Sequence, residues 1–193
     1  MALEKSSSFN SGESGFSLIE VMVATGLLVT ALVTLAQLFV ISTRSNIGSH
    51  NTTYAAVLAE QKLEELRALA WGYDTQGLPL SDTTTNTAVS PETPTGGTGL
   101  SPSPSTALQS NTTGYVDYVD QFGNKLGTGG NPPDKAIYTR RWSITPLPTN
   151  PNNTLVLQVL VTRNRNRGSA DQGAVLRLPE EARMITVKTR KAQ

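Results

Sequence analysis

Hydrophobic side chains form one uninterrupted run near the start of the chain. Residues 21–43 contain no charged side chain, and residues 21–41 would rise roughly 32 Å as a helix. The hydrocarbon core of a bilayer is about 30 Å thick, so this run is long enough to cross it. The pattern predicts that residues 16–43 form the transmembrane half of a long N-terminal helix.

A second, amphipathic pattern follows in residues 44–72. Its apolar positions recur at the helical spacings of three and four: Ala56, Ala59, Leu63, Leu66 and Ala70. We expect the helix to pack this stripe against a sheet and to end near Trp71-Gly72, where the glycine stops it. Residues 46–51, which include Gly48, are a place where the helix could bend.

The remaining faces of this helix carry charges. The charged positions are Glu60, Lys62, Glu64, Glu65 and Arg67. Lys62 and Glu65, like Glu64 and Arg67, stand three residues apart, which is the spacing of ordinary surface ion pairs. We therefore expect these side chains to be solvated rather than to bind a partner.

Residues 73–114 change character and are rich in Thr, Ser, Pro, Gly and Asn, with few large apolar side chains. Such a composition cannot bury a core of its own. The segment is predicted to be a long, low-complexity surface loop, which is mobile.

Strand patterns dominate residues 115–193. Five short segments suit strands and are separated by turn-rich stretches: 115–119, 137–145, 155–161, 174–178 and 184–189. Two of these segments alternate. Tyr138, Arg140, Trp142 and Ile144 lie on one side of the first, and Leu155, Leu157, Val159 and Val161 lie on one side of the second. The chain is thus predicted to be an α+β protein with a helix laid on an antiparallel meander.

Composition limits the available chemistry. The chain has no Cys and a single His, His50, and its net charge is +1. Disulfides and thiolate metal sites are therefore excluded, and a Ser-His-Asp triad finds no support. We expect a structural protein, not an enzyme, and we expect no cofactor.

The start of the hydrophobic run holds a carboxylate that a simple membrane anchor does not need. The sequence there is Gly15-Phe16-Ser17-Leu18-Ile19-Glu20-Val21. A charge within a bilayer costs ~2.5–3.5 kcal/mol on insertion scales unless it finds a partner. A secretory signal peptide fits poorly, because the leader carries one Lys and two Glu and the apolar run exceeds the usual length of about 7–15 residues.

This segment resembles the class III signal of type IV pilins and type II secretion pseudopilins. The resemblance implies that residues 1–15 are a prepilin leader, that prepilin peptidase cleaves after Gly15, and that Phe16 is then N-methylated. Glu20 becomes the fifth mature residue, and it is implied to meet the N-terminal amine of a neighbouring subunit and so to set the register of assembly. The family also has a long N-terminal helix packed on a small antiparallel sheet.

The resemblance implies a single-pass protein of the bacterial inner membrane with its C-terminal domain outside the cytoplasm, later built into a pilus with other pilin subunits. The Leu-Ala-Glu-Gln-Lys-Leu-Glu-Glu-Leu helix and the Arg140-Arg141-Trp142 segment are most similar to minor pilins of the modification-protein subgroup. A type II secretion pseudopilin is the second interpretation. A single-pass protein whose outer domain binds a ligand is the third.

One face of the apolar helix carries small and polar residues. They are Gly26, Thr30, Thr34 and Gln37, which fall within roughly an 80° arc. Such a stripe lets helices approach closely in lipid, and Gln can donate across the interface. The alternative is that the threonines bond back to their own helix.

Two weaker possibilities concern ligands. Asp117 and Asp120 are candidates for calcium, although no glycine-rich loop of the required spacing accompanies them. Arg163, Arg165 and Arg167, and Arg140-Arg141-Trp142, suit contacts to nucleic acid. The mature chain would hold 15 Lys and Arg against 13 Asp and Glu, so its charge gives little attraction to nucleic acid, and we treat this partner as the less favoured one.

Overall fold

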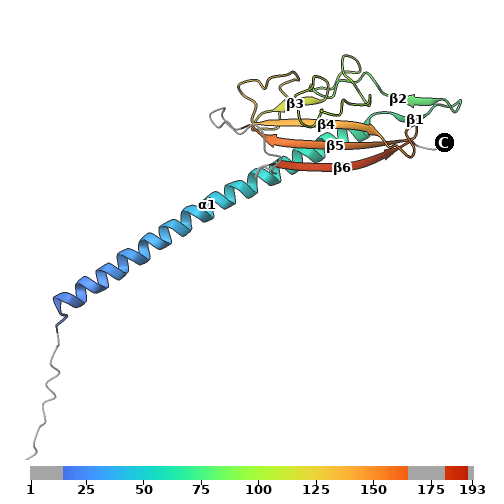
Figure 1. Ribbon diagram of the computed structural model, residues 1–193. Helices are drawn as coiled ribbons and strands as arrows, with labels where there is room; N and C mark the ends of the chain where they lie inside the picture. The colour runs from blue at the N-terminus through green and yellow to red at the C-terminus, as the bar shows by residue number, and fades with distance from the viewer. Residues whose placement is uncertain (1–14, 165–180, 191–193) are drawn as a thin grey trace, which may run out of the picture. The chain divides into compact units, whose positions relative to one another are not determined.

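The computed structural model describes residues 15–164 and 181–190 (Figure 1). Within these residues, one α-helix, α1, covers Leu18–Ala68 and is followed by six β-strands. The chain divides into two compact units, Met1–Ser45 and Asn46–Gln193, and the division falls within α1.

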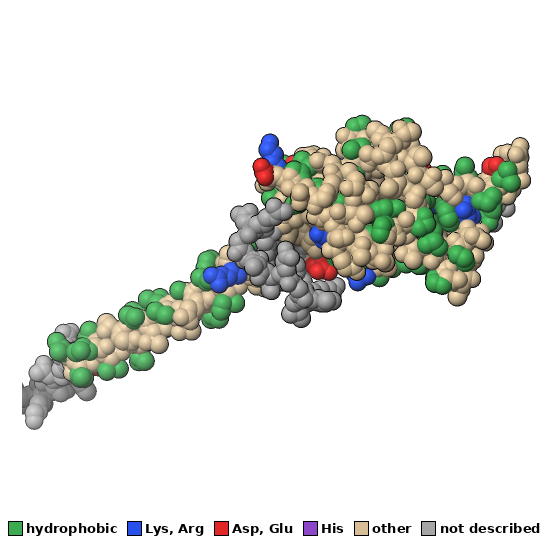
Figure 2. All heavy atoms as spheres, turned by 45° about the horizontal axis from the view of Figure 1, so that its top comes forward, with side chains coloured by type: hydrophobic (Ala, Val, Ile, Leu, Met, Phe, Trp, Pro, Cys, Tyr) green, Lys and Arg blue, Asp and Glu red, His purple; other side chains and the backbone are tan. Residues whose placement is uncertain are grey.

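The described part of the N-terminal unit is the first portion of α1 and the three residues before it. Every side chain from Gly15 to Gln37 is exposed, and Figure 2 shows hydrophobic side chains along this helix. The helix is long and apolar enough to cross a membrane by length and composition, a test that a signal sequence near the N-terminus also passes. The predicted apolar helix is confirmed to that extent.

The C-terminal unit contains a four-stranded antiparallel sheet in the order β3-β4-β5-β6. Its strands are β3 (Val116–Val119), β4 (Tyr138–Pro146), β5 (Thr154–Arg163) and β6 (Glu181–Thr189). Two short strands, β1 (Trp71–Tyr73) and β2 (Pro79–Ser81), form a separate hairpin. The predicted antiparallel meander and α+β class are confirmed, while the predicted strand over residues 174–178 lies outside the described residues.

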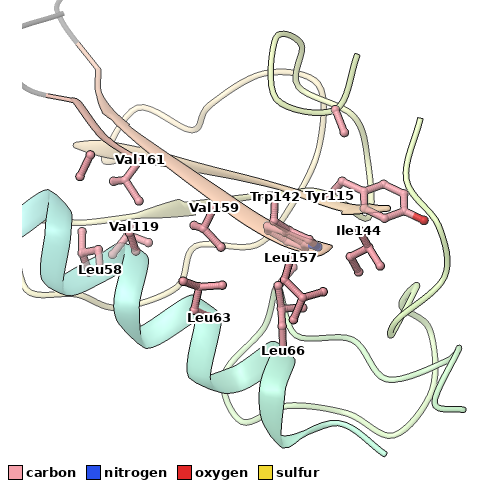
Figure 3. Close-up of a cluster of buried hydrophobic side chains, with 14 of the residues drawn as sticks. Leu58, Leu63, Leu66, Tyr115, Val119, Trp142, Ile144, Leu157, Val159 and Val161 are labelled. Carbon is pink, nitrogen blue, oxygen red and sulfur yellow. The ribbon is translucent and has the colours of Figure 1, made fainter. Parts of the chain in front are cut away.

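The core lies between α1 and one face of this sheet, as Figure 3 shows. Leu58, Leu63 and Leu66 of the helix pack toward β4 and β5. The inward side chains of the two strands are those that alternation grouped together, and each is at most 4% exposed: Tyr138, Arg140, Trp142, Ile144, Leu155, Leu157, Val159 and Val161. Period-two alternation therefore grouped these side chains correctly, and the structure shows that both groups face the core.

The predicted end of the helix was wrong. α1 ends at Ala68, and Trp71-Gly72 belongs to β1. Asp74 turns the chain into β2, because its carboxylate accepts hydrogen bonds from the backbone N–H groups of Gln76 and Leu78 at 2.9 and 2.8 Å. Because the helix ends before it, Ala70 lies outside the helical stripe and is exposed. Residues 46–51, where we considered a bend, are helical throughout.

The helical stripe itself needs a partial correction. Ala59, Leu63 and Leu66 are buried as expected, but Ala56 is only half-buried. The buried face instead includes Ala55, Leu58 and Lys62, three positions that we had not placed there. The stripe is therefore rotated toward Lys62 relative to the expected one.

The low-complexity segment, which was predicted to be a surface loop without a core of its own, contributes side chains to the main core. Ala88, Leu100 and Ala107 are at most 2% exposed and belong to the main core. Hydrogen bonds fix the segment to the sheet: the N–H of Ser103 donates to the Ile144 carbonyl at 2.9 Å, and the Ile144 N–H donates to Ser103 Oγ at 3.0 Å. Small side chains permit this close packing, which composition alone does not reveal.

One arginine fastens the β1–β2 hairpin. The guanidinium of Arg190 lies 3.7 Å from the centre of the Trp71 ring. It donates to the carbonyls of Gly72 and Leu80, both at 2.9 Å, and to the carbonyl of Asn152 at 2.6 Å. Residue 190 therefore joins the hairpin to the turn between β4 and β5.

We predict that Leu66→Ala lowers the free energy of unfolding by about 2–5 kcal/mol, because it opens a cavity where the side chain is fully buried. Leu80→Ala is the matched control, since that leucine is 51% exposed and its truncation leaves no cavity. Denaturant unfolding of the full chain in detergent measures both. Equal losses for the two variants would contradict the assigned core.

Candidate functional site

The residues of the predicted processing site lie just before α1. The helix begins at Leu18, and the carbonyl of Ser17 accepts hydrogen bonds from the N–H groups of Glu20 and Val21 at 3.0 and 3.1 Å. Gly15 and Phe16 precede the helix and are exposed, with Phe16 82% accessible. The peptide bond between them therefore lies outside regular secondary structure.

Glu20 lies in the first turn of the helix and its side chain is exposed. Unpaired N–H groups give a helix N-terminus a partial positive charge, so a carboxylate is favoured there. Glu20 forms no ion pair with any described residue. Residue 16 stands four positions earlier in the chain, before the helix begins at Leu18.

The small-residue stripe is exposed within its own unit. Thr30 Oγ donates to the Gly26 carbonyl and Thr34 Oγ to the Thr30 carbonyl, both at 2.9 Å. The alternative that the threonines bond back to their own helix is thus observed. Gly26 and Gln37 are exposed as well, and packing of this stripe on another helix stays a prediction.

The second group of functional interest is an ion cluster in the C-terminal unit, made of Lys62, Glu65, Asp117, Lys125 and Arg140. Two nitrogens of Arg140, Nε and one terminal nitrogen, donate to the two carboxylate oxygens of Asp117 at 2.7 and 2.8 Å. Lys62 Nζ lies 3.0 Å from Asp117 Oδ2, and both side chains are fully buried. Glu65 extends the cluster to the surface, because its Oε2 lies 3.2 Å from Lys62 Nζ and 3.0 Å from Lys125 Nζ.

Further contacts satisfy the buried lysine. Lys62 Nζ donates to the carbonyl and the hydroxyl of Thr87 at 2.7 and 2.9 Å. It also lies 4.0 Å from the centre of the Trp142 ring, a cation–π contact. The cluster thus joins the helix, β3, β4 and the segment around residue 87.

The charges of the ion cluster shift the pKa values of its members. Burial alone would raise the pKa of Asp117, but the charges of Lys62 and Arg140 outweigh it and hold that pKa below its ordinary value of 3.8. Burial lowers the pKa of Lys62 from 10.5, although Asp117 opposes that shift. Asp117 is therefore the ionised centre on which both cations depend.

These positions correct three expectations. Lys62 is not on a solvated face, and its pairing with Glu65 is not an ordinary surface pair. Asp117 is engaged by Arg140 and Lys62 and cannot serve calcium, while Asp120 caps a turn by accepting from the N–H groups of Phe122 and Asn124 at 2.8 and 2.9 Å. Within the described residues, no group of three or more His, Asp or Glu could hold a metal ion.

The arginines proposed for nucleic acid are dispersed. Arg140 is buried in the ion cluster, and Arg141 is half-buried with its Nε donating to Asn111 Oδ1 at 2.8 Å. Arg163 is exposed at the end of β5, whereas Arg165 and Arg167 lie outside the described residues. The Arg140-Arg141-Trp142 part of that interpretation is wrong, because the arginine and the aromatic ring both face the core.

Comparison with protein-family models, with curated proteins and with solved structures found no match to this chain.

We predict that Asp117→Asn lowers the free energy of unfolding by about 3–5 kcal/mol, because it leaves two buried cations without their shared anion. The control is Glu64→Gln, which breaks an ion pair whose side chains are 61% and 52% exposed and should cost under about 1 kcal/mol. Thermal unfolding in detergent measures both.

The contribution of Asp117 to stability depends on pH. Because the pKa of Asp117 is lower in the folded protein than in the unfolded chain, its ionised form stabilises the protein at pH values above 3.8. This stabilisation is lost as the pH falls from 3.8 through the pKa of the folded state. The stability difference between wild type and Asp117→Asn should therefore shrink only below about pH 4. A difference that vanishes near neutral pH would show that Asp117 is not the ionised centre.

Proposed function

We propose that this protein is a minor type IV pilin-like structural subunit, which is cleaved and methylated by prepilin peptidase and then assembled into, or primes, a pilus. The observation that carries the proposal is the arrangement at the start of α1. An exposed Gly15-Phe16 bond precedes the helix, and Glu20 lies in its first turn. A scissile glycine, a new N-terminus and a carboxylate four residues later are the parts that such a signal requires.

The chemistry of the N-terminal segment supports this role. Cleavage after Gly15 would place a positively charged amine on Phe16, four residues before Glu20, so the two charges could pair within one chain or between neighbours. In a bilayer an unpaired carboxylate is costly. A subunit inserted at the wrong axial height would leave Glu20 unmatched, so the pair would act as a check on register.

The remainder of the chain is compatible with a subunit held by its helix. The C-terminal unit packs the second portion of α1 against the sheet through hydrophobic contacts and the ion cluster. On this proposal the protein resides in the bacterial inner membrane, with this unit outside the cytoplasm.

Two other functions stay open to test. A type II secretion pseudopilin would be processed in the same way and would differ in the apparatus with which it assembles. A single-pass protein with a ligand-binding outer domain would keep residues 1–15. N-terminal processing therefore separates the third interpretation from the first two.

We predict that membranes containing prepilin peptidase yield a chain beginning at N-methylated Phe16. Gly15→Leu should block cleavage, because the scissile position must fit closely and glycine has no side chain. Gly26→Leu is the matched control within the same apolar helix. Intact-mass measurement decides the result, and a wild-type chain that retains residues 1–15 in these membranes would refute the proposal.

We predict that Glu20→Ala is inserted and cleaved but enters filaments less than wild type, because the neighbour's amine loses its partner. Glu20→Gln separates polarity from charge, since it keeps a polar side chain that cannot neutralise the amine. Membrane level, N-terminus and amount in sheared filaments are compared for the three proteins. Wild-type incorporation of both variants would mean that Glu20 does not guide assembly.

A further inference from the structure

The β1–β2 hairpin lies at the end of the sheet where β4 leads into β5 (Figure 1), and residues of both places line a cavity of about 510 Å³. Ligand sites usually measure about 300–1,000 Å³. Trp71 and Tyr73 of β1 line this cavity, together with Leu100 and Leu155, which are 2% and 1% exposed. Its walls also include four prolines: Pro79, Pro102, Pro146 and Pro151. The lining is therefore largely apolar, and it is rigid where proline fixes the backbone.

The positive charge of this cavity is already engaged by its own chain. Arg190 lines the cavity, and a guanidinium has five N–H donors. Four of these are used: they donate to the carbonyls of Gly72, Leu80 and Asn152 and to Ser81 Oγ. Among the described residues, no Asp or Glu lines the cavity. The cavity therefore offers little to hold an anion, and no carboxylate to accept a hydrogen bond from a ligand.

Several other donors along the cavity are unused within the described part of the chain. The amide nitrogens of Asn152 and Asn153 donate to no described residue. The hydroxyls of Thr83 and Ser101 form no hydrogen bond there either. The Trp71 indole N–H donates to the Asn153 carbonyl at 3.4 Å, which is long for a hydrogen bond. The cavity is thus apolar and carries donors that a ligand can engage.

A ligand that matches this lining is apolar along its length and offers acceptors without needing acceptors in return. A polyproline II helix has these properties, because its carbonyls make no internal hydrogen bonds and proline has no N–H. Proline-rich segments in this conformation dock into grooves lined by aromatic side chains. A carbohydrate matches less well, since its hydroxyls donate as well as accept and the described lining has no carboxylate to receive them.

We propose that this cavity binds a proline-rich segment of another protein in the polyproline II conformation. The proline rings lie against Trp71 and Tyr73, and the carbonyls of the segment accept from the amide nitrogens of Asn152 and Asn153. Arg190 acts as a positioning residue, because its guanidinium lies 3.7 Å from the centre of the Trp71 ring and holds the hairpin against the β4–β5 turn.

The choice of another protein, rather than a second copy, rests on the proposed function. A minor subunit, present in few copies, meets other proteins more often than its own kind. The cavity itself contains no residue of the processing site, so its ability to bind can be measured independently of cleavage.

NMR of the indole N–H groups tests the proposal on the full chain in detergent. The chain has two Trp, and Trp142 is an internal control because it is 1% exposed and does not line the cavity. The probe is a peptide of about ten L-prolines, roughly 31 Å long as polyproline II. It should shift the Trp71 signal, which is assigned by its loss in Trp71→Phe, and leave the Trp142 signal in place. The matched control is the same peptide made of D-prolines, which forms a helix of the opposite hand and should shift neither signal.

A pair of asparagine variants gives a second readout. Asn152→Asp should weaken binding of the L-peptide about five- to twentyfold, because it replaces a donor by a charged acceptor that faces carbonyls. The side chain of Asn152 is exposed, so the fold does not depend on it. Asn150→Asp is the matched control, since it makes the same charge change in the same turn at an exposed residue that does not line the cavity. Equal losses for the two variants would overturn the site.

The remaining outcomes each count against the proposal. No Trp71 shift at millimolar L-peptide, or an equal shift with the D-peptide, would overturn it. A shift with maltoheptaose or inorganic phosphate but not with the L-peptide would assign the cavity to a carbohydrate or an anion. A Trp71 signal that moves with protein concentration alone would assign it to a second copy. Intact mass gives the N-terminus of the same samples: a processed chain that does not bind leaves the proposed function standing, and an unprocessed chain that binds retains the site and refutes that function.

Discussion

The ionised carboxylate of Asp117 is the point on which the C-terminal unit depends. It is held by two nitrogens of Arg140 and approached by Lys62, and none of the three side chains reaches solvent. Each group tolerates burial only because the others are present. Since the three come from β3, β4 and α1, the cluster ties the helix to the sheet in one arrangement, and the hydrophobic contacts around Trp142 and Leu66 are formed in that arrangement.

Alternation along the strands was sufficient to group the side chains of the inner face of the sheet, because one-sided burial imposes a period of two. The same rule placed Arg140 on one side of the strand with Tyr138 and Trp142, but its charge suggested contact with nucleic acid rather than burial. What the sequence did not disclose was the partner, because pairing of Asp117 with Arg140 depends on the register of β3 with β4. Register is a long-range property that no local window contains.

Lys62 illustrates a different limit. It stands four residues after Leu58 and four before Leu66, both of which are buried in the structure, but the stripe expected from the sequence did not include it, because its charge argued for solvent. Tertiary pairing overrode the usual preference of lysine. In the segment 73–114, small residues such as Ala88 and Ala107 fill space next to the sheet, and composition gave no sign of this because it counts large apolar side chains. At the N-terminus the sequence motif carries the candidate site, to which the fold adds the exposure of Gly15-Phe16 and the start of the helix.

The contacts that Arg190 makes with the β1–β2 hairpin have a consequence for the timing of folding. Its hydrogen bond to the Gly72 carbonyl spans 118 residues of chain, which a ribosome adds in roughly 6–24 s. Before residue 190 has been synthesised, the Trp71 ring and the carbonyls of Gly72 and Leu80 lack the guanidinium that contacts them in the folded protein. A chain in synthesis would therefore carry the β1–β2 hairpin without its attachment to the turn between β4 and β5, and this attachment forms only after both have been made.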